Sequence, residues 1–289
     1  MPLPICYLNG EYLPLADARV SPLDRAFLFG DAVYEVIPVY GERPFRLREH
    51  LDRLARSLAG IRMDAPLSHI EWHAVCRELI ARNGGGDQYL YLQVTRGAEY
   101  GRNHAWGPGL KPTLFAYATA LEQPSQALLE QGVAAVTAAD TRWARRDIKS
   151  TALLANILLK KLSADAGAFE TIMLEHGELT EGSSTTVHVI KEGAIHTPPN
   201  GRQILPGTTR DVVGELAHRS GVSSRSVAVT EAELRSADEI WLAFSTRGIL
   251  PVTLLDGKAV GGGKPGPLFK RLYAAFQNYT RELVGTAAL

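Results

Sequence analysis

Two absences limit what this chain can be. Cys6 and Cys76 are its only cysteines among 289 residues, which favours free thiols in a reducing compartment over a disulfide framework. The chain has no run of the roughly eighteen apolar residues that a membrane-spanning helix needs. Its first residues lack a basic segment followed by a long apolar stretch, so no secretory signal is expected. These absences predict a cytoplasmic protein with no membrane partner.

The chain also lacks an excess of charge of either sign. Lysine and arginine together number 31, and aspartate and glutamate also number 31, so the formal net charge is zero. Bulk electrostatics therefore indicate no nucleic-acid partner. Hydrophobic residues make up 45% and charged residues 21% of the chain. We expect a globular protein of one large or two modest domains, with a sizeable core.

Lysine itself is scarce, since only eight of the basic residues are lysines. Most of them follow turn signals or continue a helix, and these are expected at the surface. Lys149 differs because it follows an apolar, β-like stretch and precedes an amphipathic helix. A lysine amine attacks an aldehyde only when it is neutral. We therefore regard Lys149 as the candidate for Schiff-base chemistry.

Apolar periodicity predicts an α+β chain with mixed or antiparallel sheets in two unequal halves. Ser68 with Glu71, and Thr230 with Glu233, have the capping-box pattern of a helix start. The predicted helices cover residues 47–60, 68–83, 150 or 151 to 166 and 209–220, and a last one begins near residue 267. The predicted strands cover residues 7–13 as a hairpin, 32–37, 89–95, 113–120, 133–138, 169–174, 187–190, 194–197 and 240–244.

Residues 122–126 interrupt this pattern. The segment is polar and contains Pro124, as linkers between domains often do. We therefore predict a small N-terminal domain over residues 1–121 and a larger domain over residues 127–289.

Three segments of the second half carry complementary chemistry. Lys149 is followed thirty-two residues later by Glu181, and Thr208 and Thr209 stand where a further helix begins. Pyridoxal phosphate chemistry needs a lysine for the aldehyde, an acid for the ring nitrogen and a cradle for the phosphate. Each part alone has an ordinary explanation: a lysine paired with Asp147, a turn, and a helix cap. Their joint appearance favours the cofactor.

Together with further motifs, these segments resemble the fold-type IV pyridoxal-phosphate enzymes. That group holds branched-chain and D-amino acid aminotransferases and aminodeoxychorismate lyase. The resemblance implies a small α/β sandwich domain and a larger pseudo-barrel domain that binds pyridoxal 5'-phosphate. The motifs that carry it are Asp24-Arg25-Ala26-Phe27, Gly30–Glu35, Glu49–Leu54, Asp147–Ser150, Thr180–Ser184, Gly207–Asp211 and Ser245-Thr246.

The resemblance also implies roles for individual residues. Lys149 is expected to bond covalently to the cofactor, and Glu181 to contact its pyridine nitrogen. The expected phosphate ligands are Arg53, Thr208, Thr209 and Ser245. Without the resemblance, Arg53 is a solvated arginine or a helix partner of Glu49.

A further segment distinguishes the members of the group. If the chain is extended around residue 103, Arg102 and His104 project to the same side. With the Tyr34 hydroxyl they would suit an α-carboxylate. The pair resembles the carboxylate-binding pair of D-amino acid aminotransferases, which comes from the partner subunit, so a homodimer with a shared active site is implied.

The expected reaction is transamination of a D-amino acid, of the D-alanine type, with a 2-oxo acid such as 2-oxoglutarate. A branched-chain L-amino acid transaminase, an (R)-amine transaminase and aminodeoxychorismate lyase remain alternatives. Pro38 and Arg247 depart from the usual pattern of the D-amino acid enzymes and bear on substrate range. No metal site is expected, because His69 and His73 have helical metal-ligand spacing but no third ligand.

Overall fold

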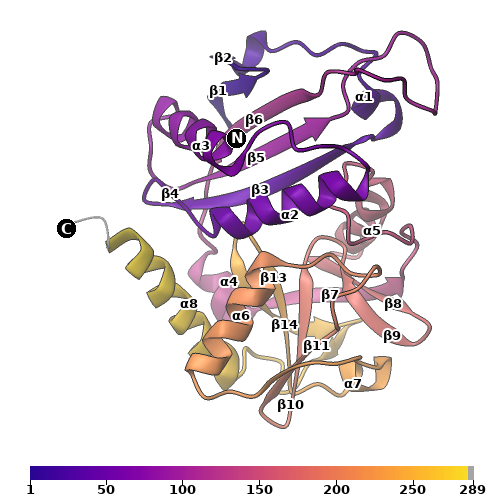
Figure 1. Cartoon of the computed structure of the whole chain (residues 1–289). Coiled ribbons are helices and arrows are strands. Elements are labelled where there is room, and N and C mark those ends of the chain that lie inside the picture. Colours follow the sequence, from indigo (N-terminus) through magenta and orange to yellow (C-terminus); the bar gives the residue numbers. More distant parts are fainter. Residues whose placement is uncertain (286–289) are drawn as a thin grey trace. The chain divides into compact units, whose positions relative to one another are not determined.

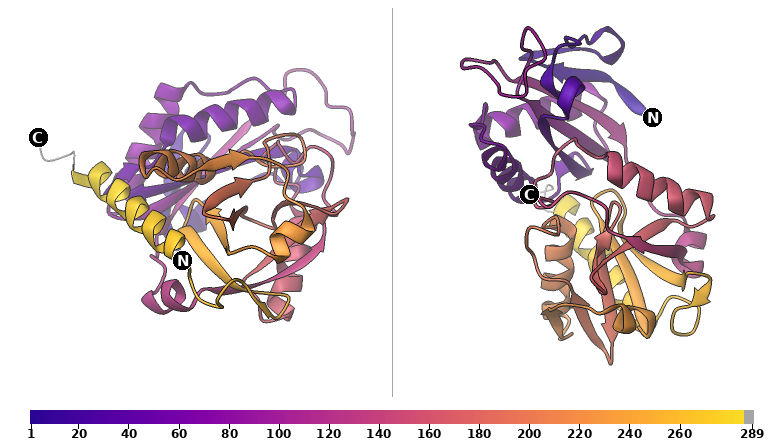
Figure 2. Two further views of the ribbon diagram at one scale, coloured as in Figure 1. Left: turned by 90° about the horizontal axis from the view of Figure 1, so that it is seen from below. Right: turned by 90° about the vertical axis from the view of Figure 1, so that its right-hand side faces the viewer.

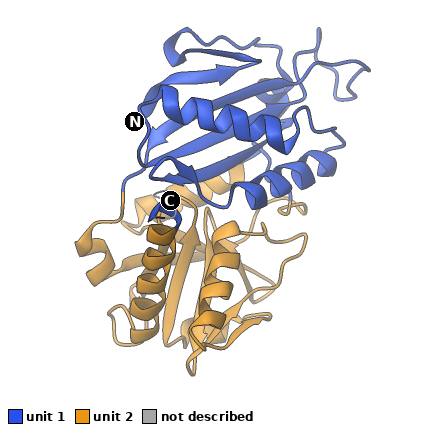
Figure 3. Cartoon of the chain, turned by 60° about the vertical axis from the view of Figure 1, so that its left-hand side comes forward, with its two compact units in different colours: residues 1–122, 148–153, 283–289 blue, residues 123–147, 154–282 orange. Residues whose placement is uncertain are grey.

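The computed structural model describes residues 1–285, and its helices and strands form two compact units (Figure 3). Unit 1 contains residues 1–122 and 148–153, together with the described residues from Leu283 onward. Unit 2 contains residues 123–147 and 154–282. Helices and strands are mixed in both units, so the predicted α+β class is confirmed.

Unit 1 is built on a six-stranded sheet in the order β2-β1-β6-β5-β3-β4 (Figure 1). Every neighbouring pair is antiparallel. Asn9 and Gly10 both have positive φ at the β1–β2 turn, as the predicted hairpin requires. The strands are β1 (Pro2–Leu8), β2 (Glu11–Pro14), β3 (Ala32–Tyr40), β4 (Arg43–Pro44), β5 (Gln88–Thr95) and β6 (Thr113–Ala120).

Two amphipathic helices pack on this sheet, α2 (Leu47–Gly60) and α3 (His69–Arg82) (Figure 1). The leucine stripe of α2 is buried against apolar residues of β3 and β5. The Ser68–Glu71 capping box is present at the start of α3, so that prediction is confirmed. The periodicity predicted neither the 3-10 turn at Leu15–Asp17 nor the short helix α1 (Arg25–Phe29).

Residues 148–153 join unit 1 through the backbone of β3. The Tyr34 N–H donates to the Lys149 carbonyl at 3.0 Å, and Thr151 N–H donates to the Ala32 carbonyl at 3.0 Å. Ser150 forms an isolated bridge with Val33. The predicted helix start at Ser150 or Thr151 is therefore wrong, because this backbone pairs with a strand. The sequence pattern alone assigns the whole segment to the second domain.

Unit 2 is built on a nine-stranded mixed sheet that curls around its own apolar core (Figure 2). β7 runs parallel to β8 and β14, and β11 runs parallel to β12. The other pairs are antiparallel. The strands are β7 (Val133–Ala139), β8 (Glu170–Glu175), β9 (Glu178–Gly182), β10 (Thr186–Lys191), β11 (Ala194–Thr197), β12 (Ser224–Ser226), β13 (Glu239–Phe244), β14 (Gly248–Leu255) and β15 (Lys258–Ala259).

The helices of unit 2 lie on and around this sheet (Figure 1). They are α4 (Gln126–Gln131), α5 (Leu154–Asp165), α6 (Thr208–Arg219), α7 (Glu231–Arg235) and α8 (Pro267–Gly285), whose last turn is counted with unit 1. α7 begins with the predicted Thr230–Glu233 capping box. None of the helices within residues 1–285 is long and apolar enough to cross a membrane.

Both cysteines are free and buried. Cys76 lies in α3 within the core of unit 1, and burial raises the pKa of its thiol to about 12. A thiol with so high a pKa is protonated at neutral pH and reacts slowly. Cys76 therefore behaves as a small apolar core residue.

The α3 cap gives a stability prediction. Replacing Ser68 with alanine removes the acceptor of the Glu71 N–H and should lower the free energy of unfolding by about 1 kcal/mol. Ser223→Ala, at an exposed serine outside the helices, should change it by less than about 0.5 kcal/mol. Urea denaturation measures both values, and equal effects of the two variants would contradict the capping role.

Candidate active site

The backbone of Lys149 is fixed from both sides within unit 1. Its N–H donates to Ser57 Oγ at 3.1 Å, and its carbonyl accepts from the Tyr34 N–H at 3.0 Å. Ser57 is buried in α2, so a helix and a strand both hold the residue. The Lys149 amine lies 4.3 Å from the centre of the Tyr34 ring. The structure therefore places these two predicted site residues side by side.

Tyr34 is itself held by its neighbours across the sheet. Its ring stacks on that of Tyr91 with centroids 5.5 Å apart and planes 23° apart. The Tyr91 hydroxyl donates to Gln93 Oε1 at 2.7 Å. Stacked aromatic pairs of this kind restrict ring orientation, so the wall beside Lys149 is preorganised.

Arg53 is buried in α2 and is bound by a carboxylate. Its Nε donates to Glu35 Oε1 at 2.7 Å and its Nη2 to Glu35 Oε2 at 2.8 Å. His50 Nδ1 lies 2.7 Å from Glu35 Oε2. All three side chains are less than 5% exposed. Arg53 is thus a fixed, buried cation, and it is not the solvated arginine that the helix pattern alone suggested.

The charges of this cluster are settled by competing effects. Burial disfavours ionisation of Glu35, but Arg53 and His50 outweigh it and hold the pKa of Glu35 below its usual range. Burial lowers the pKa of His50 against the opposing effect of Glu35. A neutral His50 next to a carboxylate must carry its proton on Nδ1 and donate it to Glu35. The cluster therefore carries one anion and one cation.

Arg102 and His104 lie in a loop between β5 and β6. The loop has no strand structure, so the extended backbone that the sequence argument assumed is wrong. The two side chains nevertheless lie near one ring, that of Phe29. The Arg102 guanidinium is 5.2 Å from its centre, and the His104 ring meets it edge-on at 5.4 Å. Both residues are exposed.

In unit 2, Glu181 is the centre of a buried ion network. It lies in β9, not in the turn that the Thr-Glu-Gly pattern suggests. Arg142 binds both Glu181 and Asp140, and the Asp140 contact measures 2.7 Å. The Leu205 N–H lies 3.3 and 3.4 Å from the two Glu181 oxygens. Burial raises the pKa of Glu181, against the opposing charge of Arg142 and the Leu205 hydrogen bond.

A second buried carboxylate supports the same segment. Glu170 is fully buried in β8 and accepts hydrogen bonds from the hydroxyls of Ser183 and Ser184, the latter at 3.0 Å. The Ser183 N–H donates to the Thr171 carbonyl at 2.9 Å. The two serines that follow Glu181 therefore anchor β9 to β8.

The N-terminus of α6 has the features of an anion cradle. Thr208 and Thr209 open the helix and are buried. Gly207, at the N-cap, has no side chain to accept from the first N–H groups. A Cβ there would lie 2.6 Å from Thr186 Oγ1, so the close packing excludes a larger residue. Ser245 is half-buried in the turn between β13 and β14.

The arginines near Lys149 in sequence have carboxylate partners of their own. Arg145 binds Asp147 at 2.9 Å, and Arg146 binds Glu175 at 2.7 Å. Asp147, which the sequence offered as a partner for Lys149, is therefore occupied by Arg145. Arg247, one of the two departures noted in the sequence, is exposed with its guanidinium 5.7 Å from the Phe169 ring centre.

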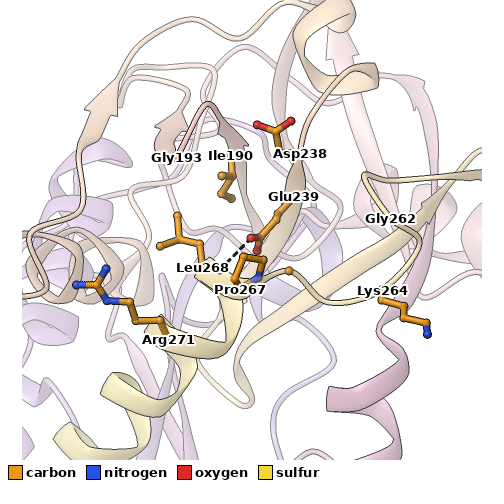
Figure 4. Close-up of a pocket in the computed structure, with 10 residues that line it drawn as sticks. Ile190, Gly193, Asp238, Glu239, Gly262, Lys264, Pro267, Leu268 and Arg271 are labelled. Carbon is orange, nitrogen blue, oxygen red and sulfur yellow. Dashed lines mark hydrogen bonds between the residues drawn. The ribbon is translucent and has the colours of Figure 1, made fainter.

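Unit 2 also has an open cavity of about 510 Å³ near the start of α8 (Figure 4). Lys264 and Arg271 line it together with Asp238 and Glu239, so its charges balance. Glu239 already accepts the N–H groups of Leu268 and Phe269 at the helix N-terminus, at 3.0 and 2.9 Å. No predicted site residue is among the residues that line this cavity.

The donor sets match the parts of pyridoxal phosphate. A carboxylate has about four lone-pair sites, so Glu181 retains capacity for a pyridinium N–H beside Arg142 and Leu205. A helix N-terminus with adjacent hydroxyls is suited to a phosphate. Lys149 provides an amine next to an aromatic wall. The residues present therefore fit the cofactor.

Residues 32–255 match the protein family described as amino-transferase class IV. The chain belongs to the class IV aminotransferases. Enzymes of this family depend on pyridoxal 5'-phosphate, and the cofactor expected from the sequence is confirmed for this enzyme.

Two curated relatives of the enzyme cover nearly its full length. The D-alanine aminotransferase of Bacillus licheniformis is 42% identical over 93% of this chain and 95% of its own. That of Staphylococcus haemolyticus is 36% identical over 94% of this chain and 96% of its own.

Solved structures of the same fold are more distant in sequence. The branched-chain amino acid aminotransferase of Escherichia coli has a TM-score of 0.90 at 28% identity, over 96% of this chain and 94% of that one. A second branched-chain enzyme, from the source abbreviated T.th. and solved with pyridoxamine 5'-phosphate, has a TM-score of 0.88 at 26% identity, over 96% of this chain and 94% of that one. The predicted fold-type IV class is confirmed.

Some functional side chains escaped the sequence reasoning. Glu35 was included in the strand 32–37 but was not recognised as the carboxylate of Arg53. A charged residue two positions from Val33 and Ile37, which share its inward face, was the available signal. Asp140, the second partner of Arg142, gave no comparable signal, because its role depends on a contact 39 residues from Glu181 in Arg142.

The buried Glu35–Arg53 pair predicts a pH-dependent stability. Glu35→Gln should lower the free energy of unfolding by about 3 kcal/mol at pH 7, because it leaves Arg53 without its buried counter-charge. The folded-state pKa of Glu35 is depressed, so this stabilisation is present above the unfolded pKa of about 4.3 and is lost as pH falls below it. Urea denaturation from pH 7 to pH 3 should show the two proteins converging.

A matched control comes from an exposed pair. Glu78→Gln removes the partner of Arg82, whose side chains are 47% and 49% exposed. Its stability should remain close to that of the unaltered protein over the same range, since exposed pairs are screened by water. A constant gap between Glu35→Gln and the unaltered protein down to pH 3 would contradict the charge assignment.

Proposed function

We propose that the enzyme transaminates D-amino acids of the D-alanine type, with a 2-oxo acid such as 2-oxoglutarate as the acceptor. The observation that carries the proposal is the grouping of Arg102 and His104 about the Phe29 ring. A guanidinium and an imidazole held together form a site for a carboxylate, which both substrates possess. The two D-alanine aminotransferases that resemble this chain over nearly its full length support the same substrate class.

In the proposed reaction, Lys149 is the group that moves protons. When bound, pyridoxal phosphate supplies an aldehyde that condenses with amines and a pyridinium ring that withdraws electrons from the substrate Cα. Lys149 Nζ accepts the Cα proton as a base and later releases it as an acid. Its backbone bonds to Ser57 and Tyr34 limit where that amine can move.

The other assigned residues hold the cofactor and the substrate. Glu181, supported by Arg142, bonds the ring nitrogen, and an ionised carboxylate there favours the protonated ring. The phosphate ligands we assign are Arg53, Thr208, Thr209 and Ser245. Tyr34 lies beside Lys149 and offers its hydroxyl to the substrate carboxylate.

We also propose that the enzyme works as a homodimer in the cytoplasm. Arg102 and His104 are exposed in the single chain, as expected of residues that serve the active site of the partner. An apolar stripe on α5 is exposed as well, by 44% to 70%, at Leu154, Ile157, Leu158 and Leu162. Residues spaced in this way form one helix face, and such a face is suited to a second copy of the chain. Two unpaired cysteines fit a reducing compartment.

Two alternatives remain, and both use the same cofactor residues. A branched-chain L-amino acid or (R)-amine transaminase would need a different carboxylate arrangement or none. Aminodeoxychorismate lyase would release pyruvate without a 2-oxo acid acceptor. Neither has a specific use for the Arg102–His104 pair on Phe29.

The enantiomer preference tests the proposed function directly. With 2-oxoglutarate as acceptor, turnover with D-alanine should exceed turnover with L-alanine by at least about 10²-fold, since a fixed carboxylate site and a fixed base accept one hand. Pyruvate formation in a coupled assay gives both rates. Lys149→Ala is the control, and it should lose both turnover and the visible absorption of the bound cofactor. A preference for L-alanine, or pyruvate release without an acceptor, would reject the proposal.

The α5 stripe gives a separate prediction. Ile157→Glu should produce monomers and lower the kcat/KM for D-alanine more than tenfold, because it places a charge in the proposed contact and removes the partner's Arg102 and His104. Ile70→Glu, at an isoleucine of α3 that is 82% exposed, should remain dimeric and active. Light scattering and steady-state kinetics measure the two effects. A fully active monomer of Ile157→Glu would refute the shared site.

A further inference from the structure

We propose that α1 and the residue before it are a positioning device for Arg102 and His104. In this assignment, Asp24 fixes the stems of the loop over residues 96–112, Arg25 fixes its tip, and Phe29 orients the two side chains. The inference rests on the proposed function, in which Arg102 and His104 bind the substrate carboxylate. It adds residues that touch neither substrate nor cofactor but set where the carboxylate binds.

Asp24 connects both ends of the loop. Its Oδ2 accepts the hydroxyl of Thr95 at 2.9 Å and that of Thr113 at 2.7 Å. Thr95 is the last residue of β5 and Thr113 the first of β6. Asp24 is 1% exposed and also caps α1 through the Ala26 N–H at 2.8 Å. One buried carboxylate therefore joins the helix to both stems of the loop.

Arg25 reaches the part of the loop that carries the pair. Its Nη1 donates to the Asn103 carbonyl at 2.6 Å and its Nη2 to the His104 carbonyl at 3.0 Å. The same guanidinium binds Glu99 and Asp31, each at 2.9 Å. Arg25 is 3% exposed, so the donors of a rigid, buried fork are spent on shaping a surface loop.

Further contacts stiffen the loop around this centre. Glu99 Oε1 accepts the Gly107 N–H at 2.9 Å, across the base of the segment that contains Arg102. Arg96 binds Asp31 at 2.7 Å and places its guanidinium 3.9 Å from the centre of the Trp106 ring. The backbone of the loop is therefore fixed on both sides of Arg102 and His104.

Phe29 then orients the side chains themselves. Its ring contacts three charged or polar groups, with Arg25 at 4.8 Å and Arg102 at 5.2 Å from its centre and His104 edge-on at 5.4 Å. The ring is fixed because α1 ends at Gly30, which has a φ of 67° and caps the helix through its N–H to the Ala26 carbonyl. A left-handed residue without a Cβ allows this sharp exit.

This arrangement has a kinetic consequence. Arginine has several rotatable bonds, and an exposed arginine that must be ordered on binding loses affinity for its ligand. A ring that restricts the Arg102 guanidinium before the substrate arrives removes part of that cost. The effect should appear in substrate affinity and not in the proton transfers at Lys149, which lie elsewhere in the reaction.

The test is a double-mutant cycle with steady-state kinetics for D-alanine on the holoenzyme. Arg102→Ala alone should raise KM by more than about tenfold, as expected for a lost charge-assisted hydrogen bond. Phe29→Leu should raise KM about fivefold and leave kcat within about twofold, because it removes the cation–π and edge contacts. In the Arg102→Ala background, Phe29→Leu should add less than about twofold, since its target is gone.

Two further variants complete the experiment. Phe29→Tyr keeps the ring and should retain a KM close to that of the unaltered enzyme. Arg25→Lys keeps the charge but loses the fork to the two carbonyls, and it should raise KM without changing kcat, which gives a second reading if Phe29→Leu folds poorly.

The outcomes separate the two proposals. An unchanged KM in Arg102→Ala would reject the carboxylate assignment and, with it, the positioning role. A raised KM in Arg102→Ala with full additivity of Phe29→Leu would leave the carboxylate assignment intact and overturn the positioning role. An equal loss in Phe29→Leu and Phe29→Tyr, or an effect on kcat alone, would also overturn it.

Discussion

The structure depends on the rule that a buried charge must be paired. Glu35 and Arg53 in the core face of unit 1, and Arg142 with Glu181 in unit 2, are pairs of this kind. Removing one member leaves the other desolvated without compensation, which costs several kcal/mol. Each pair therefore constrains where a guanidinium or a carboxylate points. Chemistry that uses those groups gains its precision from the same contacts that keep the protein folded.

The same rule explains why the candidate site uses arginine where lysine would carry equal charge. Arg53, Arg142 and Arg25 each bind at least two acceptors at once, through different nitrogens of a planar group. A lysine ammonium is a point charge and fixes no plane. Lysine is scarce in this chain, and Lys149 is held by its backbone, so that its amine remains the mobile group.

The parts predictable from sequence are those with a local signal. The leucine stripe of α2 and the capping boxes of α3 and α7 follow from residues within one or two turns, and the structure confirms them. The start of α5 has no such signal, because Ser150 and Thr151 pair with β3 over a hundred residues away. The role of Arg25 is likewise set by the loop at residues 96–112, to which only the folded sheet connects it. Motifs named Lys149 and Glu181 but not their supports.

Residues assigned to the cofactor and to the substrate differ in where they sit. Arg53, Glu181 and Thr208 lie in α2, β9 and α6, whose geometry changes little when side chains elsewhere change. Arg102 and His104 lie in a loop that regular structure does not fix. A branched-chain aminotransferase that shares this fold at 28% identity can therefore keep the cofactor chemistry while its loops differ. Because a loop has no ladder to hold it, its precision has to come from side chains such as Asp24 and Arg25. Substrate preference in this family can change by altering such supports as well as the residues that touch the substrate.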